Sequence, residues 1–157
     1  MSSTDPNDQN VVTNTIVDGM SVTSVITFSG TETDACVLSG FTIRNGCCSG
    51  GGAGIQGDGR TATIAHCIIT QNMGNGLGNC NGIIRECTIT HNGGSGLYSC
   101  DGTISDCIIT DCDATITNCI INNNSGGGLD NCDGAITNFT ISREPGGESM
   151  LLNPGTR

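Results

Sequence analysis

Residues 61–81 read TATIAHCIITQNMGNGLGNCN, and residues 82–101 repeat the pattern as GIIRECTITHNGGSGLYSCD. A third copy, ATITNCIINNNSGGGLDNCD, follows at residues 114–133. Isoleucine, cysteine, asparagine, glycine and leucine recur at matching places in these copies. A fixed period of about 20 residues is the sequence signature of a solenoid, in which each repeat forms one coil and packs on its neighbours.

Within each repeat, polar and apolar residues alternate one by one, as in Cys87-Thr88-Ile89-Thr90. This is the period of a β-strand, whose successive side chains point to opposite faces. Turns rich in Gly, Asn and Ser separate the strands. We therefore predict an all-β solenoid, a single-stranded parallel β-helix with rungs about 4.8 Å apart. The predicted inward columns are Ile64, Ile84, Ile104, Ile116 and Ile136; Cys67, Cys87, Cys107, Cys119 and Phe139; Ile69, Ile89, Ile109, Ile121 and Ile141; Cys80, Cys100, Cys112 and Cys132; and Leu77, Leu97 and Leu129.

The rungs differ in length along the chain. Aligning Val17 with Ile43 and Ile69 gives two longer 26-residue rungs at the N-terminal end, up to position 66, before the 20-residue rungs begin. Cys107 and Cys119 are closer together than the period allows, and this 12-residue rung lacks its second side. The coil either pinches or leaves a notch there. We expect about seven rungs.

The whole repeat region forms one predicted domain, residues 1–142, and residues 143–157 form a C-terminal tail or cap. The N-terminal residues 2–10 are polar turn material with no amphipathic helix to cover the first rung. In the tail, Met150-Leu151-Leu152 offers a small apolar plug. Since uncovered solenoid ends expose strand edges that invite stacking, we expect end-to-end homo-oligomers.

The 11 cysteines form an odd number, so at least one thiol stays unpaired within a monomer. Most belong to inward columns, where a small apolar side chain packs on its neighbours as a cysteine ladder. Side chains stacked in register point in parallel, which is poor geometry for a disulfide. The exceptions are Cys36, Cys47 and Cys48, which fall outside the columns.

Asparagines also recur at one turn, at positions 72, 92 and 124. We predict that they form an internal asparagine ladder, whose side-chain amides satisfy buried backbone groups. His66 and His91 occupy different outward columns without a readable partner, and we interpret both as surface histidines.

The formal net charge is −10, and the chain contains no lysine. Nucleic acid is therefore excluded as a partner, because affinity for phosphate backbones comes mainly from Lys and Arg. No apolar run approaches the 18 or so residues needed to span a bilayer, which argues against membrane insertion. Residues 1–4 lack the charged and apolar segments of a secretory signal, so the protein is either cytosolic or has already lost its signal.

One acidic column stands out on the predicted exterior. Asp101, Asp113 and Asp133 each follow an inward cysteine on successive rungs. Like charges about 4.8 Å apart repel, and they either protonate more readily or attract a cation such as Ca²⁺, which prefers oxygen ligands. The column is thus a candidate calcium site, and solvated surface is the alternative. Tyr98 and Asp111 lie beside it, next to the short rung.

Threonine marks a second exterior feature. Thr88 and Thr90, with their equivalents on other rungs, form a flat face of two columns. This face is similar to the T-x-T arrays of ice-binding solenoids, although Ile and Asn replace Thr on most rungs. Thr is also simply a favourable strand residue on a pleated surface.

The unit T-I-T-N-C-I-I-x-x-N, together with residues 37–46, VLSGFTIRNG, and 50–55, GGGAGI, resembles the right-handed parallel β-helix repeat family of pectate-lyase-like folds, especially its large secreted bacterial proteins. The resemblance covers about residues 15–142. It implies a right-handed coil and an extracellular or cell-surface location. It also implies relatives among polysaccharide lyases, hydrolases and epimerases.

Such enzymes need a carboxylate-bound Ca²⁺ with a Lys or Arg base, or a pair of carboxylates. Lysine is absent, Arg85 is the only arginine near the acidic rungs, and no hydrolase motif is present. We therefore expect a non-catalytic structural or surface-interaction module, a segment of a larger extracellular protein that contacts polysaccharide or other cell-surface components. The alternative is a polysaccharide-active or glycan-binding protein working around Tyr98, Asp101, Asp111 and Asp113. Ice binding is a lesser alternative.

Overall fold

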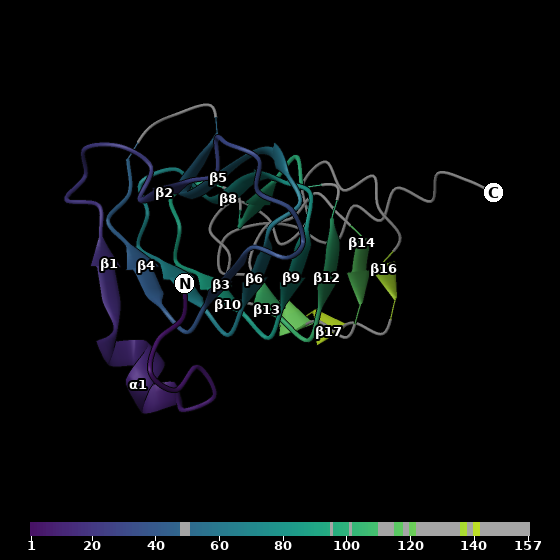
Figure 1. Cartoon of the computed structure of the whole chain (residues 1–157), viewed down its shortest axis with the longest axis horizontal. Coiled ribbons are helices and arrows are strands. Elements are labelled where there is room, and N and C mark those ends of the chain that lie inside the picture. The colour runs from purple at the N-terminus through teal and green to yellow at the C-terminus, as the bar shows by residue number, and fades with distance from the viewer. Residues whose placement is uncertain are drawn as a thin grey trace.

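The chain winds into a solenoid of parallel strands (Figure 1). The computed structural model describes residues 1–47, 51–94, 96–100 and 102–109, together with the backbone of four short strands between residues 115 and 141. Within this part, one helix, α1 (Gln9–Asn14), lies below the N-terminal end of the coil. The strands belong to three sheets that form the three sides of the solenoid.

Among the described residues, the first sheet has seven strands and the second has six. The first contains, in order, β1 (Ile16–Asp18), β4 (Thr42–Arg44), β7 (Ile68–Thr70), β10 (Thr88–Thr90), β13 (Ile108–Ile109), β15 (Ile120–Ile121) and β17 (Thr140–Ile141). The second contains β3 (Val37–Ser39), β6 (Thr63–Ala65), β9 (Ile83–Arg85), β12 (Thr103–Ser105), β14 (Thr115–Thr117) and β16 (Ile136–Thr137).

The third sheet has four strands in the described part: β2 (Ile26–Thr27), β5 (Gly52–Arg60), β8 (Asn75–Cys80) and β11 (Leu97–Tyr98). Only about four turns therefore have a strand on all three sides within the described residues. Within the described residues the number of complete turns is thus lower than the expected seven, and the all-β parallel solenoid itself is confirmed. After β11, the chain that would form the third side lies outside the described residues.

The pairing register confirms the predicted rung lengths. Thr42 pairs with Ile68, as the longer N-terminal rung requires, and Ile68 pairs with Thr88, as the shorter repeat requires. Ile108 pairs with Ile120 across the 12-residue rung. The short rung thus keeps its place in the first sheet and, through Thr103 and Thr115, in the second. Whether the third side pinches or leaves a notch lies outside the described residues.

The core consists of apolar side chains stacked in columns. Each fully buried Ile or Leu contributes about 1.5–3 kcal/mol relative to an exposed one. Leu77 and Leu97 pair in register on adjacent strands of the third sheet, and both side chains are fully buried. The other fully buried large side chains are Ile43, Ile69, Ile89 and Ile109 behind the first sheet, Ile64, Ile84 and Ile104 behind the second, and Ile55 behind the third.

Buried asparagines satisfy the backbone where the first sheet ends. Asn72 and Asn92 are 2% and 6% exposed. The side-chain amide of Asn72 donates to Asn92 Oδ1 at 2.9 Å, and the backbone N–H of Asn72 donates to the same oxygen at 3.2 Å. Asn92 in turn donates to the carbonyl of Ile69 at 3.2 Å. One residue type at one position therefore links adjacent turns.

The N-terminal segment differs from the expectation of uncovered polar turns. The Asp8 side chain accepts a hydrogen bond from the Asn10 backbone N–H at 2.8 Å and so caps α1. Val12 of this helix is buried, and its carbonyl accepts a hydrogen bond from the Thr42 hydroxyl at 2.9 Å. The prediction that no helix would be present was wrong because a short segment with a single buried apolar side chain shows no readable helical period.

Residues 1–3 also cover part of this end. The Ser3 N–H donates to the Ser39 carbonyl, and the Ser39 N–H donates to the Met1 carbonyl, both at 3.0 Å. The outer edge of β3 is thereby paired. β1 and β2 remain the edge strands of the first and third sheets.

Replacing Asn92 with Ala should lower the free energy of unfolding by about 2–4 kcal/mol, because it removes the acceptor of the backbone N–H and of the side-chain amide of buried Asn72. Urea denaturation followed by circular dichroism measures the loss. The matched control is Met73→Ala, next to Asn72 but 65% exposed. Equal stability of the two variants would contradict the structural role assigned to Asn92.

Candidate functional site

Tyr98 is the one predicted site residue that falls in the described part of the chain. It lies in β11, the edge strand of the third sheet, and is 39% exposed. Its strand partner is Gly78, whose other neighbour in register is Gln56. We call these three residues the Tyr98 row. The remaining candidates, Asp101, Asp111, Asp113 and Asp133, lie outside the described residues.

Gly78, at the centre of the Tyr98 row, is buried, and only glycine fits there. A Cβ added at Gly78 would lie 2.2 Å from the backbone nitrogen of Gly52, which covers this position. The Gly52 N–H donates to Gln56 Oε1 at 2.6 Å, and Gln56 Nε2 donates to Asp58 Oδ1 at 2.6 Å. Tyr98 is therefore the aromatic ring that this row exposes, at the edge of the third sheet.

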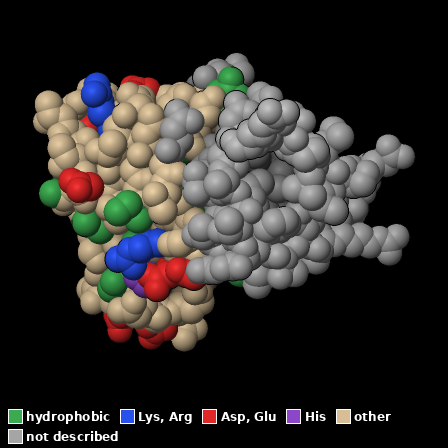
Figure 2. All heavy atoms as spheres, turned by 90° about the vertical axis from the view of Figure 1, so that its right-hand side faces the viewer, with side chains coloured by type: hydrophobic (Ala, Val, Ile, Leu, Met, Phe, Trp, Pro, Cys, Tyr) green, Lys and Arg blue, Asp and Glu red, His purple; other side chains and the backbone are tan. Residues whose placement is uncertain are grey.

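A charged cluster lies on the second side of the coil, and the sequence analysis missed it. His66 Nε2 lies 2.8 Å from Glu86 Oε2, and the same oxygen accepts a hydrogen bond from Arg85 at 2.5 Å. Arg85 is also 3.4 Å from His66 Nε2. Figure 2 shows a group of basic, acidic and histidine side chains on an otherwise mainly uncharged surface. His66 therefore has a carboxylate partner after all.

The backbone explains this cluster. His66, Glu86 and Asp106 have φ values of 50°, 54° and 55°, so all three occupy the same left-handed turn on successive rungs. Their spacing equals the repeat period, and this signal could have identified the pair from the sequence. Because Glu86 already binds both Arg85 and His66, the cluster ties two rungs together more directly than it offers an open site.

The outer face of the first sheet is flat and uncharged over three rungs. We call Ile68, Thr70, Thr88, Thr90 and Ile108 the outer strip. Thr88 pairs in register with Ile68 on one side and Ile108 on the other, and Thr90 pairs with Thr70. All five side chains are partly or well exposed. Adjacent residues in each column are about 4.8 Å apart, the spacing of neighbouring strands.

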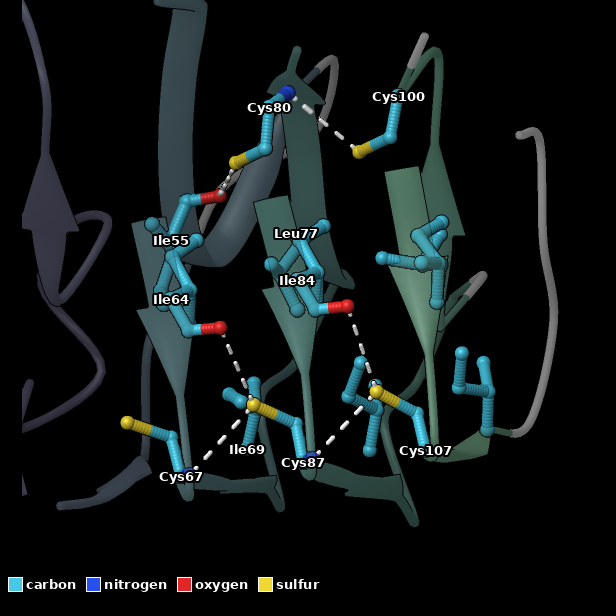
Figure 3. Packing of buried hydrophobic residues seen from close by; sticks show 14 of the residues in the cluster. Ile55, Ile64, Cys67, Ile69, Leu77, Cys80, Ile84, Cys87, Cys100 and Cys107 are labelled. Atoms are coloured by element: carbon cyan, nitrogen blue, oxygen red, sulfur yellow. Dashed lines mark hydrogen bonds between the residues drawn. The ribbon is translucent and has the colours of Figure 1, made fainter. Parts of the chain in front are cut away.

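Cysteine side chains of successive rungs lie within the buried core (Figure 3). Cys67, Cys87 and Cys107 are at most 2% exposed, and each backbone N–H of Cys67 and Cys87 donates to the sulfur one rung ahead, at 3.5 and 3.4 Å. Burial, together with the adjacent thiols, raises the pKa of Cys87 well above its usual range. Contact with Cys100 and burial likewise raise the pKa of Cys80. The thiols of Cys80 and Cys87 therefore stay protonated and serve packing rather than nucleophilic chemistry. The hydrogen bond with Cys87 instead lowers the pKa of Cys67.

Cys36 and Cys47 differ from these core cysteines. Cys36 is exposed and Cys47 is half-buried, and both are free thiols. Across the part of the chain that the structure describes, no group of three or more His, Cys, Asp or Glu side chains is arranged to hold a metal ion. In the same part, no helix has the length and apolar character that crossing a bilayer requires.

Three parallel sheets, columns of like residues and a closed core define a parallel β-solenoid. A family profile described as "Right handed beta helix region" matches residues 4–144. The chain belongs to this right-handed β-helix family, which confirms the right-handed β-helix repeat predicted from the sequence. No match was found among curated proteins or among solved structures.

The free energy of unfolding should fall above about pH 8.5, where unfolded cysteines ionise. The reason is that the raised pKa values of Cys80 and Cys87 keep these thiols protonated when folded, so the folded state binds more protons than the unfolded state in this range. Melting temperatures at pH 7 to 10 measure the effect. Replacing both residues with Ala should flatten the alkaline fall, whereas an unchanged fall would contradict this assignment.

Proposed function

We propose that this chain is a rigid, non-catalytic β-helix module that binds a flat, uncharged partner through its outer strip, in an extracellular or cell-surface setting. The observation that carries the proposal is the strip itself. In a chain of net charge −10, it presents only Ile and Thr over three rungs, with β-branched side chains held in register. Side chains fixed in place lose little conformational entropy on binding, so such a face favours contact with a similarly rigid surface.

Polar and charged residues border the strip rather than interrupt it. His66, Glu86 and Asp106 occupy the turn that precedes it, Gln71 and His91 occupy the turn that follows, and Arg44 pairs in register with Thr70 at its edge. The border carries charges of both signs, whereas the centre of the strip is uncharged. Insoluble cell-wall polysaccharides such as cellulose or chitin are the partner class proposed, because their surfaces are uncharged, flat and regular.

A second candidate function is glycan binding or polysaccharide chemistry at the Tyr98 row. The favouring observation is the exposed aromatic ring of Tyr98 on the edge strand of the third sheet. Asp101, Asp111 and Asp113 would complete such a site from the short rung.

Co-sedimentation of the protein with cellulose and chitin tests both candidates. Replacing Thr88 with Glu should reduce binding at least tenfold, because the polymer surface would have to desolvate a carboxylate at the centre of the strip. Thr103→Glu, an exposed threonine on the second sheet, is the matched control and should bind as well as the original chain.

The outcomes separate the candidates. If Tyr98→Ala loses binding while Thr88→Glu binds in full, the binding site is the Tyr98 row and not the outer strip. Release of soluble sugar from either polymer would contradict the non-catalytic assignment. A flat, uncharged face could also contact ice, and thermal hysteresis that disappears in Thr88→Glu would redirect the proposal to ice.

Calcium binding by Asp101, Asp113 and Asp133 is a separate proposal. The supporting observation is that Thr103 pairs in register with Thr115. Asp101 and Asp113 each precede one of these threonines by two positions in the sequence. Carboxylate oxygens are ligands that Ca²⁺ prefers.

Millimolar Ca²⁺ should raise the melting temperature by several degrees over the value in EDTA, because a ligand of the folded state stabilises it. The double variant Asp101→Asn, Asp113→Asn should lose this shift. The double variant Asp5→Asn, Asp8→Asn, at the opposite end of the coil, is the charge-matched control and should retain it. An equal melting temperature of the original chain in Ca²⁺ and in EDTA would contradict the calcium proposal.

A further inference from the structure

A hollow of about 370 Å³ opens at the N-terminal end of the solenoid. It lies between β2 and β3, on the first turn. Its lining is almost wholly apolar: Met1, Ile26, Phe28, Ala35, Cys36, Val37 and Leu38. Ile26 and Phe28 pack against the main core but are only partly buried, so the apolar interior reaches the surface here.

Apolar exposure is concentrated around this end. Among the described residues, the exposed large apolar side chains of the first turn are Met1, Ile16, Met20, Val22 and Val37. Beside the hollow, β2 is an edge strand of the third sheet and has a paired neighbour on one side only. An open strand edge next to an apolar hollow can accept an added strand whose side chains enter the hollow.

The sequence contains one segment suited to this position. Within residues 142–157, the only run of three large apolar residues is Met150-Leu151-Leu152. Residues 150–157 carry Arg157 and no acidic residue, whereas the connection between β2 and β3 carries Glu32 and Asp34. The Met150–Leu152 segment itself has no charged side chain and so does not add to the negative charge of this connection.

We propose that the hollow receives the Met150–Leu152 segment of a second copy of this chain, with Leu151 inside it, so that copies join head to tail. This contact is independent of the outer strip and goes beyond the proposed function. Such a heterologous contact does not close on itself, and it extends the solenoid into a longer rod.

Distances favour a second copy over the chain's own tail. β1 and β17 are the opposite ends of the first sheet, six strand spacings apart, or about 29 Å. The chain from Ile141 to Leu151 reaches at most about 33–36 Å when fully extended. The chain's own segment would therefore have to run almost straight along the whole coil, whereas a segment from a second copy has no such restriction on its length.

Cross-linking of the full-length chain tests the proposal, because Cys36 lines the hollow. A Leu151→Cys variant treated with a short bis-maleimide should give covalent dimers and larger multiples. Adding Cys36→Ser should reduce these products at least threefold, while reaction at other cysteines remains as background. Cys36 is exposed, so this substitution leaves the core intact.

Sedimentation equilibrium provides a second measurement without added cysteines. The average mass of the original chain should rise with concentration, and Leu151→Asp should hold it at the monomer mass. Met73→Asp, an exposed apolar position elsewhere, is the matched control and should associate like the original chain.

Three results would each overturn the proposal. The first is a cross-link between Cys36 and the thiol introduced by Leu151→Cys that forms only within monomers. The second is a yield of covalent dimers that Cys36→Ser leaves unchanged. The third is an equal average mass for the original chain and for Leu151→Asp across the concentration range.

Discussion

The structure depends on hydrogen bonding between parallel strands stacked one turn above another. Each rung is held about 4.8 Å from the next, so every residue contacts its equivalent in the neighbouring turn. Isoleucine therefore packs on isoleucine, the Cys67 N–H meets the sulfur of Cys87, and the amide of Asn72 meets that of Asn92. A change in rung length is tolerated only if the pairing is kept, as Ile108 and Ile120 keep it across the 12-residue rung.

Because of this stacking, a partner can contact only the outer faces and the ends of the coil. Where the described interior is filled by isoleucine, leucine and cysteine, the surfaces open to a partner are the flat outer faces and the ends of the coil. The outer strip and the Tyr98 row are both rows of side chains at a spacing set by the backbone. Their chemistry differs because the strip consists only of Ile and Thr, whereas the Tyr98 row places Gly78 beside an aromatic residue.

The repeat made most of the fold predictable. Once Val17, Ile43 and Ile69 are aligned, the strands of the first sheet and their register follow, since the residues of one column pair with one another on successive strands. Helix α1 did not follow, because its single buried residue, Val12, is recognised only when β4 lies against it. The His66–Glu86 pair was readable in principle from the repeat spacing, but a left-handed turn had to place both side chains on the same side.

The sequence by itself determined the class of fold, the lengths of the rungs and which residues face the interior, because a short fixed period with strand alternation has few other solutions. Only the tertiary structure decided how the N-terminal end is covered, where charged groups meet, and that an apolar hollow opens beside Cys36. These features involve residues outside the repeat or at its turns. Their neighbours are set by how the chain packs in space, which no local pattern encodes.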